Sequence, residues 1–287
     1  MTEVVRSLKK TAIEIRKSVL QMIYKAKSGH TSSDFSCADI LTTLYFHVLN
    51  IDPENPEDPE RDRYIQSKGH AAEVLWAVLA KRGFFPEKEL DTFYEFGSRL
   101  IGHPNNEVAG VEMNTGSLGH GLPISVGIAL AAKMDNKKYH TYTLLGDGEL
   151  AEGSVWEGAM AAAHYKLDNL TAIIDRNDLQ ITGKTEDVMN AEPLREKFEA
   201  FGWQVIDVED GNSIEQLLEA FNAEHEEGKP KMIIAHTTKG KGFSLAENKA
   251  EWHHKVPSED EYELAMQELD QQLGAIKNDN QTEKQYS

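Results

Sequence analysis

Residues 144–183 read LLGDGELAEGSVWEGAMAAAHYKLDNLTAIIDRNDLQITG, with polar loops near both ends. The apolar, β-branched runs Tyr142–Leu145 and Leu170–Ile174 each stop abruptly at one of these loops. Between them, from about Glu152 to Tyr165, small residues predict a helix. This order indicates a βαβ unit, whose parallel strands are buried on both faces. We therefore predict an α/β fold, a doubly wound parallel sheet flanked by helices, which binds its ligand at the carboxyl ends of the strands.

The two loops offer complementary oxygen ligands. Gly146 and Gly148 flank Asp147, so the backbone there can approach a phosphate closely. Asn177 lies in the corresponding loop after the second strand. A carboxylate and an amide oxygen suit a magnesium or calcium ion that also holds phosphate oxygens. Either loop alone is equally well explained as a turn or a helix cap, but the two on successive strand ends favour a diphosphate site.

Composition narrows the class of protein. The 287 residues, 40% of them hydrophobic, suffice for one large globular domain or for a domain with appendages. A net charge of −18 argues against nucleic acid or anionic membrane as a partner, because phosphate groups would be repelled. With Cys37 as the single cysteine, no signal-like segment and no apolar run of about 18 residues, we expect a cytoplasmic protein.

Apolar spacing predicts further elements on both sides of the βαβ unit. Helices are expected at 2–28, Cys37–Leu49, Leu122–Met134, Glu196–Phe201 and Ser213–His225, and strands at Tyr64–Gln66, Trp203–Val208 and Lys231–His236. A last helix is expected to begin at the Ser258 cap and to end near Leu273. The polar residues Lys277–Ser287 are expected to be disordered, so we place the main domain at 1–265 and the helix end and tail at 266–287.

Histidines recur next to glycines. His30, His70 and His103 each follow a glycine at an expected element end, and His253 and His254 form a pair in EWHHKVP. A lone histidine is more often structural or solvated than functional. Three Gly-His pairs at element ends are a different observation, because glycine lets the backbone turn so that an imidazole can project into a shared cleft.

These loops and histidine motifs resemble known families. Gly-Asp-Gly followed by Asn about 30 residues later resembles the diphosphate-binding motif of thiamine diphosphate enzymes. The motifs that resemble transketolase follow in that family's order over about 10–265: SGHTSSDFSCADIL (28–41), SKGHAAEVL (67–75), GHP (102–104), TGSLGHG (115–121) and EWHHKVP (251–257). The resemblance implies that 1–265 is the diphosphate-binding domain, with the thiamine diphosphate-binding fold.

The resemblance also implies ligands for a metal and a cofactor. Asp147, Asn177 and the carbonyl of Leu179 would bind Mg²⁺, with Ca²⁺ or Mn²⁺ as substitutes. The residues implied to contact thiamine diphosphate are Ser33, His70, Gly116, Leu118, Asp147, Gly148, Glu152, Asn177, Leu179, Lys239 and His253.

The implied catalytic residues are His30, His70, His103 and either His253 or His254. His30 and the histidine at 253 or 254 would act as general acid and base on the donor C3 hydroxyl. His70 and His103 would orient the C1 hydroxyl and the oxygen of the intermediate. We expect these imidazoles to titrate near neutrality, which suits proton transfer in both directions. Alignment from either side of EWHHKVP favours a different histidine, so 253 and 254 both stay candidates. The sequence departs from the family's usual pattern at Thr31 and His120.

Transketolases continue into a pyrimidine-binding domain, which carries the glutamate that protonates the cofactor ring, whereas this sequence ends after the diphosphate-binding domain. The resemblance therefore implies the N-terminal subunit of a split transketolase, which works with a separate C-terminal chain as an α2β2 heterotetramer. It would move a two-carbon ketol unit from a ketose phosphate to an aldose phosphate, as in the pentose phosphate pathway. The alternatives are another thiamine diphosphate enzyme, such as a deoxyxylulose-phosphate synthase or a decarboxylase subunit, and a non-catalytic scaffold subunit.

Overall fold

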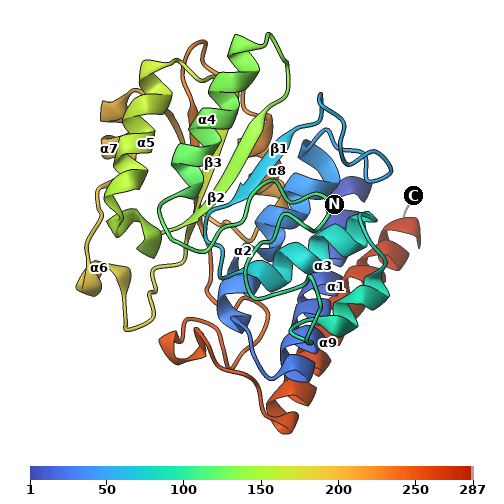
Figure 1. The fold of residues 1–287 in the computed structure, drawn as a ribbon. Coiled ribbons are helices and arrows are strands. Elements are labelled where there is room, and N and C mark those ends of the chain that lie inside the picture. The colour runs from blue at the N-terminus through green and yellow to red at the C-terminus, as the bar shows by residue number, and fades with distance from the viewer. Residues whose placement is uncertain (286–287) are drawn as a thin grey trace.

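A computed structural model describes the backbone of residues 1–285 and the side chains of residues 1–276. It has three layers, with a sheet between two layers of helices (Figure 1). The strands are β1 Arg63–Gln66, β2 Thr141–Gly146, β3 Leu170–Arg176, β4 Gln204–Val208 and β5 Lys231–His236. The α-helices are α1 Glu3–Ala26, α2 Thr31–Thr43, α3 Ala72–Arg82, α4 Gly121–Met134, α5 Gly153–His164, α6 Thr185–Val188, α7 Leu194–Phe201, α8 Ile214–Asn222 and α9 Glu259–Gln285.

The sheet is parallel throughout, with strand order β1-β2-β3-β5-β4. The chain passes from β3 to the edge strand β4 and returns to fill the gap with β5. In register, Leu144 of β2 lies beside Ile173 of β3, which lies beside Ile233 of β5. All carboxyl ends therefore meet at one edge of the sheet, where doubly wound folds bind ligands. This confirms the predicted fold class.

Successive strand residues are buried on opposite faces, as expected for a sheet covered on both sides. Leu144 and Ile173 point into the larger hydrophobic core, which α1, α2, α3, α8 and α9 cover. Leu145 and Ile174 point into a second core, formed with α4, α5 and α7. Figure 1 shows α4 and α5 on one side of the strands and α1, α3 and α9 on the other. Both layers hold the carboxyl ends rigidly in place.

The predicted βαβ unit is confirmed as β2, α5 and β3. The second helix was placed wrongly: α2 begins at Thr31, and Leu44–Val48 is a π-helix. The helix α3 was not predicted. The reason is the same for both, because all thirteen residues of α2 are buried and so are Ala72–Ala80 of α3. A helix that is buried on every side has no polar face, so its sequence lacks the amphipathic period.

The last helix, α9, extends past Leu273, where we predicted its end, to Gln285. We predicted disorder for Lys277–Ser287. The side chains from Lys277 onward and the backbone of Tyr286 and Ser287 lie outside the described part of the chain. α9 packs antiparallel to α1, since Lys17 pairs with Asp270 at 2.6 Å and the rings of Tyr24 and Tyr262 stack 4.2 Å apart. Within the described residues, no helix is long and apolar enough to cross a membrane.

Candidate active site

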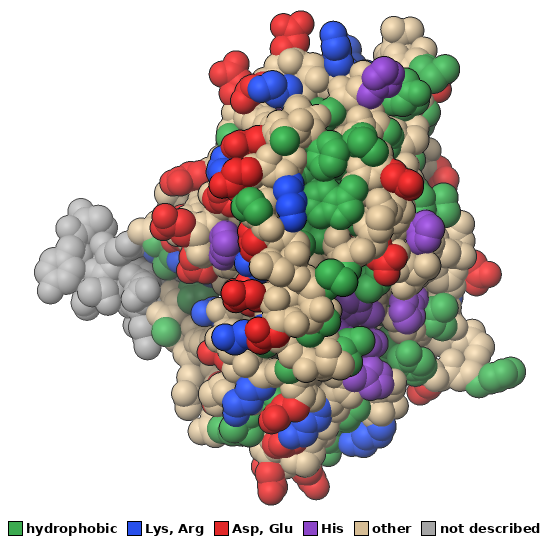
Figure 2. Space-filling model, turned by 90° about the vertical axis from the view of Figure 1, so that its left-hand side faces the viewer, with side chains coloured by type: hydrophobic (Ala, Val, Ile, Leu, Met, Phe, Trp, Pro, Cys, Tyr) green, Lys and Arg blue, Asp and Glu red, His purple; other side chains and the backbone are tan. Residues whose placement is uncertain are grey.

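A cavity of about 450 Å³ lies at the carboxyl ends of the strands. Figure 2 shows histidine side chains gathered around a hollow on one face of the molecule. The predicted site residues that line the cavity are His30, Ser33, His70, Gly116, Leu118, Asp147, Gly148, Asn177, Leu179, Lys239 and His253. Residues separated by more than two hundred positions thus meet in one place.

Three predicted residues do not line the cavity. His103 lies against Gly116, where a Cβ would come within 2.7 Å of the imidazole. The ring of His254 lies 4.6 Å from that of His30. Glu152 is exposed and packs beside Gly119. Of the two candidates at the EWHHKVP motif, His253 therefore lines the cavity, while His254 is exposed beside His30.

The predicted metal ligands are held by the two loops after β2 and β3. Asp147 accepts hydrogen bonds from the backbone N–H of Gly148 at 2.8 Å and of Asp178 at 2.7 Å. Asn177 Oδ1 accepts from Leu179 N–H at 3.3 Å, and the Leu179 carbonyl accepts from Lys239 Nζ at 3.0 Å. Burial, with repulsion from Asp175, raises the pKa of Asp147 to about 6. A buried carboxylate of this kind is stabilised by a nearby cation.

This oxygen set fits a hard divalent ion that is shared with a phosphate. It combines one carboxylate, one amide oxygen and one carbonyl, which magnesium and calcium prefer. The described residues contain no group of three or more His, Cys, Asp or Glu side chains that could hold a metal. An ion bound by Asp147, Asn177 and Leu179 therefore needs further ligands, and diphosphate oxygens supply ligands of that type. Gly148 keeps the approach open, since a Cβ there would lie 2.8 Å from Gln180.

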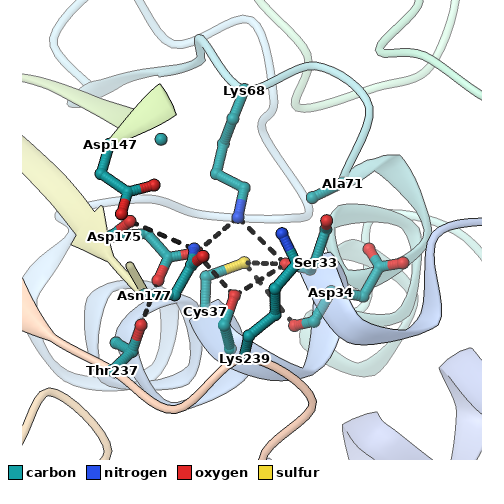
Figure 3. A network of polar contacts seen from close by, with 12 residues as sticks. Ser33, Asp34, Cys37, Lys68, Ala71, Asp147, Asp175, Asn177, Thr237 and Lys239 are labelled. Carbon is teal, nitrogen blue, oxygen red and sulfur yellow. Dashed lines mark hydrogen bonds and ion pairs between the residues drawn. The ribbon is translucent and has the colours of Figure 1, made fainter. Parts of the chain in front are cut away.

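Lys68 and Asp175 form a buried ion pair under the cavity that we did not predict (Figure 3). Lys68 Nζ also donates to the carbonyl of Ser33 at 3.0 Å, while Asp175 accepts from Ser36 at 2.6 Å and from Thr237. Burial alone would lower the pKa of Lys68, but the attraction of Asp175 outweighs it and raises the pKa. Lys68 therefore stays charged in the wall of the cavity. Its sequence signal was its place in the Ser67-Lys68-Gly69-His70 motif, directly after β1.

Glu149 is a second lining residue that we did not assign. Its carboxylate accepts from the backbone N–H groups of Gly119 at 2.7 Å and Gly146 at 3.0 Å, and from the hydroxyl of Ser67. It therefore joins three loops that surround the cavity. Gly146, which sequence analysis named as a flank of Asp147, also lines the cavity, and Gln180, Ile181 and Thr182 complete the lining that sequence reasoning missed. The sequence signal of these three was their position just after Asn177, inside the stretch that contains both predicted loops.

The histidines form a cluster at the other end of the cavity. The ring centroid of His30 lies 5.4 Å from that of His70 and 5.6 Å from that of His253. Burial, with repulsion from His254, lowers the pKa of His30 to about 4. Burial, with Lys239 and His30, lowers the pKa of His253 to about 3, and burial also lowers those of His70 and His103. Our expectation of titration near neutrality was wrong: these imidazoles are neutral at pH 7, each with one donor and one acceptor nitrogen.

The segment that bears His253 is fastened to the start of α2. Ser32 donates to the carbonyl of Trp252 at 2.9 Å, and Ser33 Oγ lies 3.4 Å from His253 Nδ1. Thr31, one of the two departures from the family's pattern, donates to the carbonyl of Lys255 at 3.3 Å. The other departure, His120, is exposed and precedes α4 without capping it. Thr31 thus helps to position the histidines, whereas His120 lies outside the cavity lining.

Comparison with known proteins agrees with this geometry. One similar protein is a subunit of the apulose-4-phosphate transketolase of Phocaeicola vulgatus, 48% identical over 92% of this chain and 94% of that protein. The 6-deoxy-6-sulfo-D-fructose transketolase subunit of a Clostridium species is 41% identical over 95% of this chain and 99% of that protein. Human transketolase is 42% identical over 95% of this chain, which spans 43% of the human protein.

Solved structures give the same result. The transketolase of Campylobacter jejuni is 30% identical and superposes with a TM-score of 0.83, covering 97% of this chain and 48% of that one. The transketolase of Leishmania mexicana is 28% identical, with a TM-score of 0.81 over 94% of this chain and 46% of that one. Residues 7–280 match the family described as "Transketolase, thiamine diphosphate binding domain". The chain therefore belongs to the transketolase family and comprises its N-terminal, thiamine diphosphate-binding domain.

Proposed function

We propose that this chain is the N-terminal subunit of a split transketolase. With a partner chain that carries the pyrimidine-binding domain, it transfers a two-carbon ketol unit from a ketose phosphate to an aldose phosphate. The observation that carries the proposal is the meeting, in one cavity, of the Asp147–Asn177–Leu179 oxygen set with a cluster of neutral histidines. A scaffold subunit would need neither.

Thiamine diphosphate and Mg²⁺ are the proposed cofactors, with Ca²⁺ or Mn²⁺ as substitutes. Asp147, Asn177 and the Leu179 carbonyl would hold the metal against the diphosphate. Lys239 and Lys68 supply positive charge in the same wall. Gly116 and Leu118, across the cavity, would contact the cofactor ring. When bound, the cofactor supplies the electron sink for carbon–carbon bond cleavage, and the protein supplies orientation and electrostatics.

The histidines would handle the protons and hydroxyl groups of the sugar. His30 and His253, whose rings lie 5.6 Å apart, would exchange the proton of the donor C3 hydroxyl. His70 and His103 would orient the C1 hydroxyl and the carbonyl oxygen through hydrogen bonds. A neutral imidazole can accept a proton at one nitrogen while it donates a hydrogen bond from the other. His254 would act on His30 through ring contact.

The partner is proposed from the relatives named as transketolase subunits, which match this chain over 94% and 99% of their own length. Closed symmetry favours two copies of each chain, an α2β2 heterotetramer. We place the complex in the cytoplasm, with sugar phosphates as substrates and with neither nucleic acid nor membrane as a partner. The apulose 4-phosphate and sulfofructose relatives indicate which other sugars belong in a substrate screen.

The test is ketol transfer from xylulose 5-phosphate to ribose 5-phosphate with thiamine diphosphate and magnesium. The chain is assayed alone and with the partner chain from its genome neighbourhood, and cofactor binding is measured with and without Mg²⁺. We expect metal-dependent binding and transfer only in the mixture. Transfer by this chain alone would contradict the need for a partner. Metal-dependent binding without transfer from any ketose tested would contradict the transketolase reaction, and absence of binding would contradict the cofactor.

A further inference from the structure

Two buried carboxyl groups lie behind the histidine cluster, and the function proposed above does not use them. Asp34 lies in the first turn of α2, four residues after His30, and Glu73 lies in the first turn of α3, three residues after His70. Both residues are fully buried at 0% exposure. In Figure 3, Asp34 lies beside Ser33 and Ala71, away from the Asp147 end of the site.

Asp34 supports the loop that carries His70, and Glu73 supports the loop that carries His30. Asp34 Oδ1 accepts from the backbone N–H of Val74 at 2.9 Å and so caps α3, whose own N-cap residue Ala71 makes no side-chain hydrogen bond. Glu73 packs on Gly29, where an added Cβ would lie 2.6 Å from its Oε1, and its carboxyl faces the backbone N–H of His30. The two loops are therefore joined reciprocally, immediately behind the histidines.

The two carboxyl groups also contact each other. They lie within hydrogen-bond reach, yet no hydrogen bond of ordinary geometry from the described residues satisfies Asp34 Oδ2 or either Glu73 oxygen. Two ionised carboxylates would repel at this position, and neither would be solvated. Burial raises the pKa of Asp34, although the positive charge of Lys68 acts in the opposite direction. Burial and the charge of Asp34 together raise the pKa of Glu73. A single proton between them removes the repulsion and joins Asp34 Oδ2 to one Glu73 oxygen in a hydrogen bond.

We propose that Asp34 and Glu73 share one proton and act as a positioning pair, which holds the His30 and His70 loops at their observed separation. The ring centroids of the two histidines lie 5.4 Å apart, and both loops turn at glycines just before the imidazole. Lys68 Nζ also joins the two segments through the Ser33 carbonyl at 3.0 Å, and the carboxyl pair adds a second link directly behind the imidazoles. The kinetic part of this inference rests on the proposed function, but the shared proton and the ring geometry do not.

The first experiment uses the chain alone. At pH 8, where Asp147 with its pKa of about 6 is ionised, we expect the infrared carbonyl band of a protonated carboxyl group. Glu73→Gln and Asp34→Asn should each remove that band, because the introduced amide donates to the remaining carboxylate. Asp62→Asn, which changes a buried carboxyl group at the start of β1, is the matched control and should leave the band in place. A band that persists in Glu73→Gln and Asp34→Asn would overturn the shared proton.

The second experiment separates positioning from packing. Glu73→Ala should shift the imidazole proton resonances of His30 and His70, and in the reconstituted complex should lower kcat about tenfold or more with little change in sugar KM. Glu73→Gln restores the link and should bring both readouts back close to the wild type. An equal loss of kcat in Glu73→Ala and Glu73→Gln, or no loss of kcat in either variant, would overturn the positioning role.

Two safeguards keep this second test decisive. Should Glu73→Ala fail to fold, Asp34→Ala against Asp34→Asn makes the same comparison. If the wild-type complex transfers no ketol unit, the proposed function fails, and the infrared and resonance measurements still decide whether the pair exists.

Discussion

The two ends of the cavity are built from opposite kinds of group. At the end formed by the loops after β1, β2 and β3, the side chains of Lys68, Asp147 and Asp175 are at most 4% exposed, and they are ionic or hydrogen-bonded. At the other end, His30, His70 and His253 are neutral, partly exposed and held mainly by ring contacts. Fixed charges thus lie where a metal and a diphosphate would bind, and neutral imidazoles lie where protons would be exchanged.

This difference has a physical reason. A permanent anion or cation is bound best by groups whose charge does not change and whose dipoles are already oriented. Lys68 and Asp175 hold each other in that state, because breaking a buried pair leaves an unpaired charge. Proton transfer needs the reverse, a group without a fixed charge that can accept a proton at one nitrogen while it donates from the other. Changes at the two ends should therefore have separable effects.

The largest expected effect is on cofactor binding, from Asp147→Ala. The substitution removes the only carboxylate of the proposed oxygen set, and we expect metal-dependent thiamine diphosphate binding to fall by at least about 100-fold. Calorimetric titration of the chain with cofactor and Mg²⁺ measures the loss. Glu186→Ala, an exposed acid in α6 beside the same loop, is the control. Unchanged affinity in Asp147→Ala would move the metal site elsewhere.

The next effect is on turnover without loss of cofactor. His30→Ala should lower kcat of the reconstituted complex by about 10²–10⁴, the usual contribution of a general acid or base. Its thiamine diphosphate affinity should stay within about threefold of the wild type, because no proposed metal or diphosphate ligand changes. His254→Ala, next to His30, should have a smaller effect because His254 does not line the cavity. A larger loss from His254→Ala than from His253→Ala would reverse the assignment within the pair.

The same comparison applies to the nearby histidine that borders the cavity. His103→Ala should lower turnover by about tenfold, less than His30→Ala, because His103 is proposed to orient the substrate and not to move its proton. Steady-state kinetics and cofactor titration on the same preparation measure both quantities. Turnover equal to the wild type in the complex would remove His103 from the site.

At the charged end, the expected effect is on stability. Lys68→Met leaves Asp175 buried without a counter-ion and should lower the free energy of unfolding by about 3–5 kcal/mol. Adding Asp175→Asn to Lys68→Met should recover part of the loss, since the amide carries no charge, its oxygen accepts from one of the Ser36 and Thr237 hydroxyls, and its NH2 group can donate to the other. Urea unfolding of the chain without cofactor measures both variants. A double variant less stable than Lys68→Met would show that the hydrogen bonds, and not the charge, matter most.

The residues themselves predicted the βαβ unit and the strand ends, because loops at strand ends carry polar residues in a buried setting, and the resemblance to transketolase implied most of the lining residues. It did not predict α3 or the start of α2, whose buried surroundings remove any periodic pattern. The Lys68–Asp175 pair spans from the end of β1 to the end of β3, on either side of β2. No local spacing connects two residues whose contact depends on strand order.

The choice between His253 and His254 shows the limit most directly. Adjacent residues differ little in sequence context, but Trp252 is buried, its carbonyl accepts from Ser32, and His253 then projects toward Ser33. The decision thus depends on a tertiary contact with α2. The low pKa values of the cluster likewise depend on burial, which the Gly-His motifs alone do not reveal.

The last expected effect is a pH dependence of stability, to which histidines near both ends of the sheet contribute. His30 has a folded pKa of about 4 against an ordinary value of 6.5, and His140, buried at the amino end of β2, has one of about 3. Because the unfolded chain takes up protons below pH 6.5 and the folded chain does not, stability is full above 6.5 and falls as the pH drops toward the folded pKa. Each histidine should contribute about 1.4 kcal/mol per pH unit in that window. Urea unfolding at several pH values measures this dependence. The free energy of unfolding should change less steeply with pH in His140→Asn than in the wild type, and the same is expected of His30→Asn. A stronger pH dependence in His30→Asn than in the wild type would contradict the low folded pKa of His30 and with it the neutral cluster, whereas the same result in His140→Asn would contradict only the low pKa of His140.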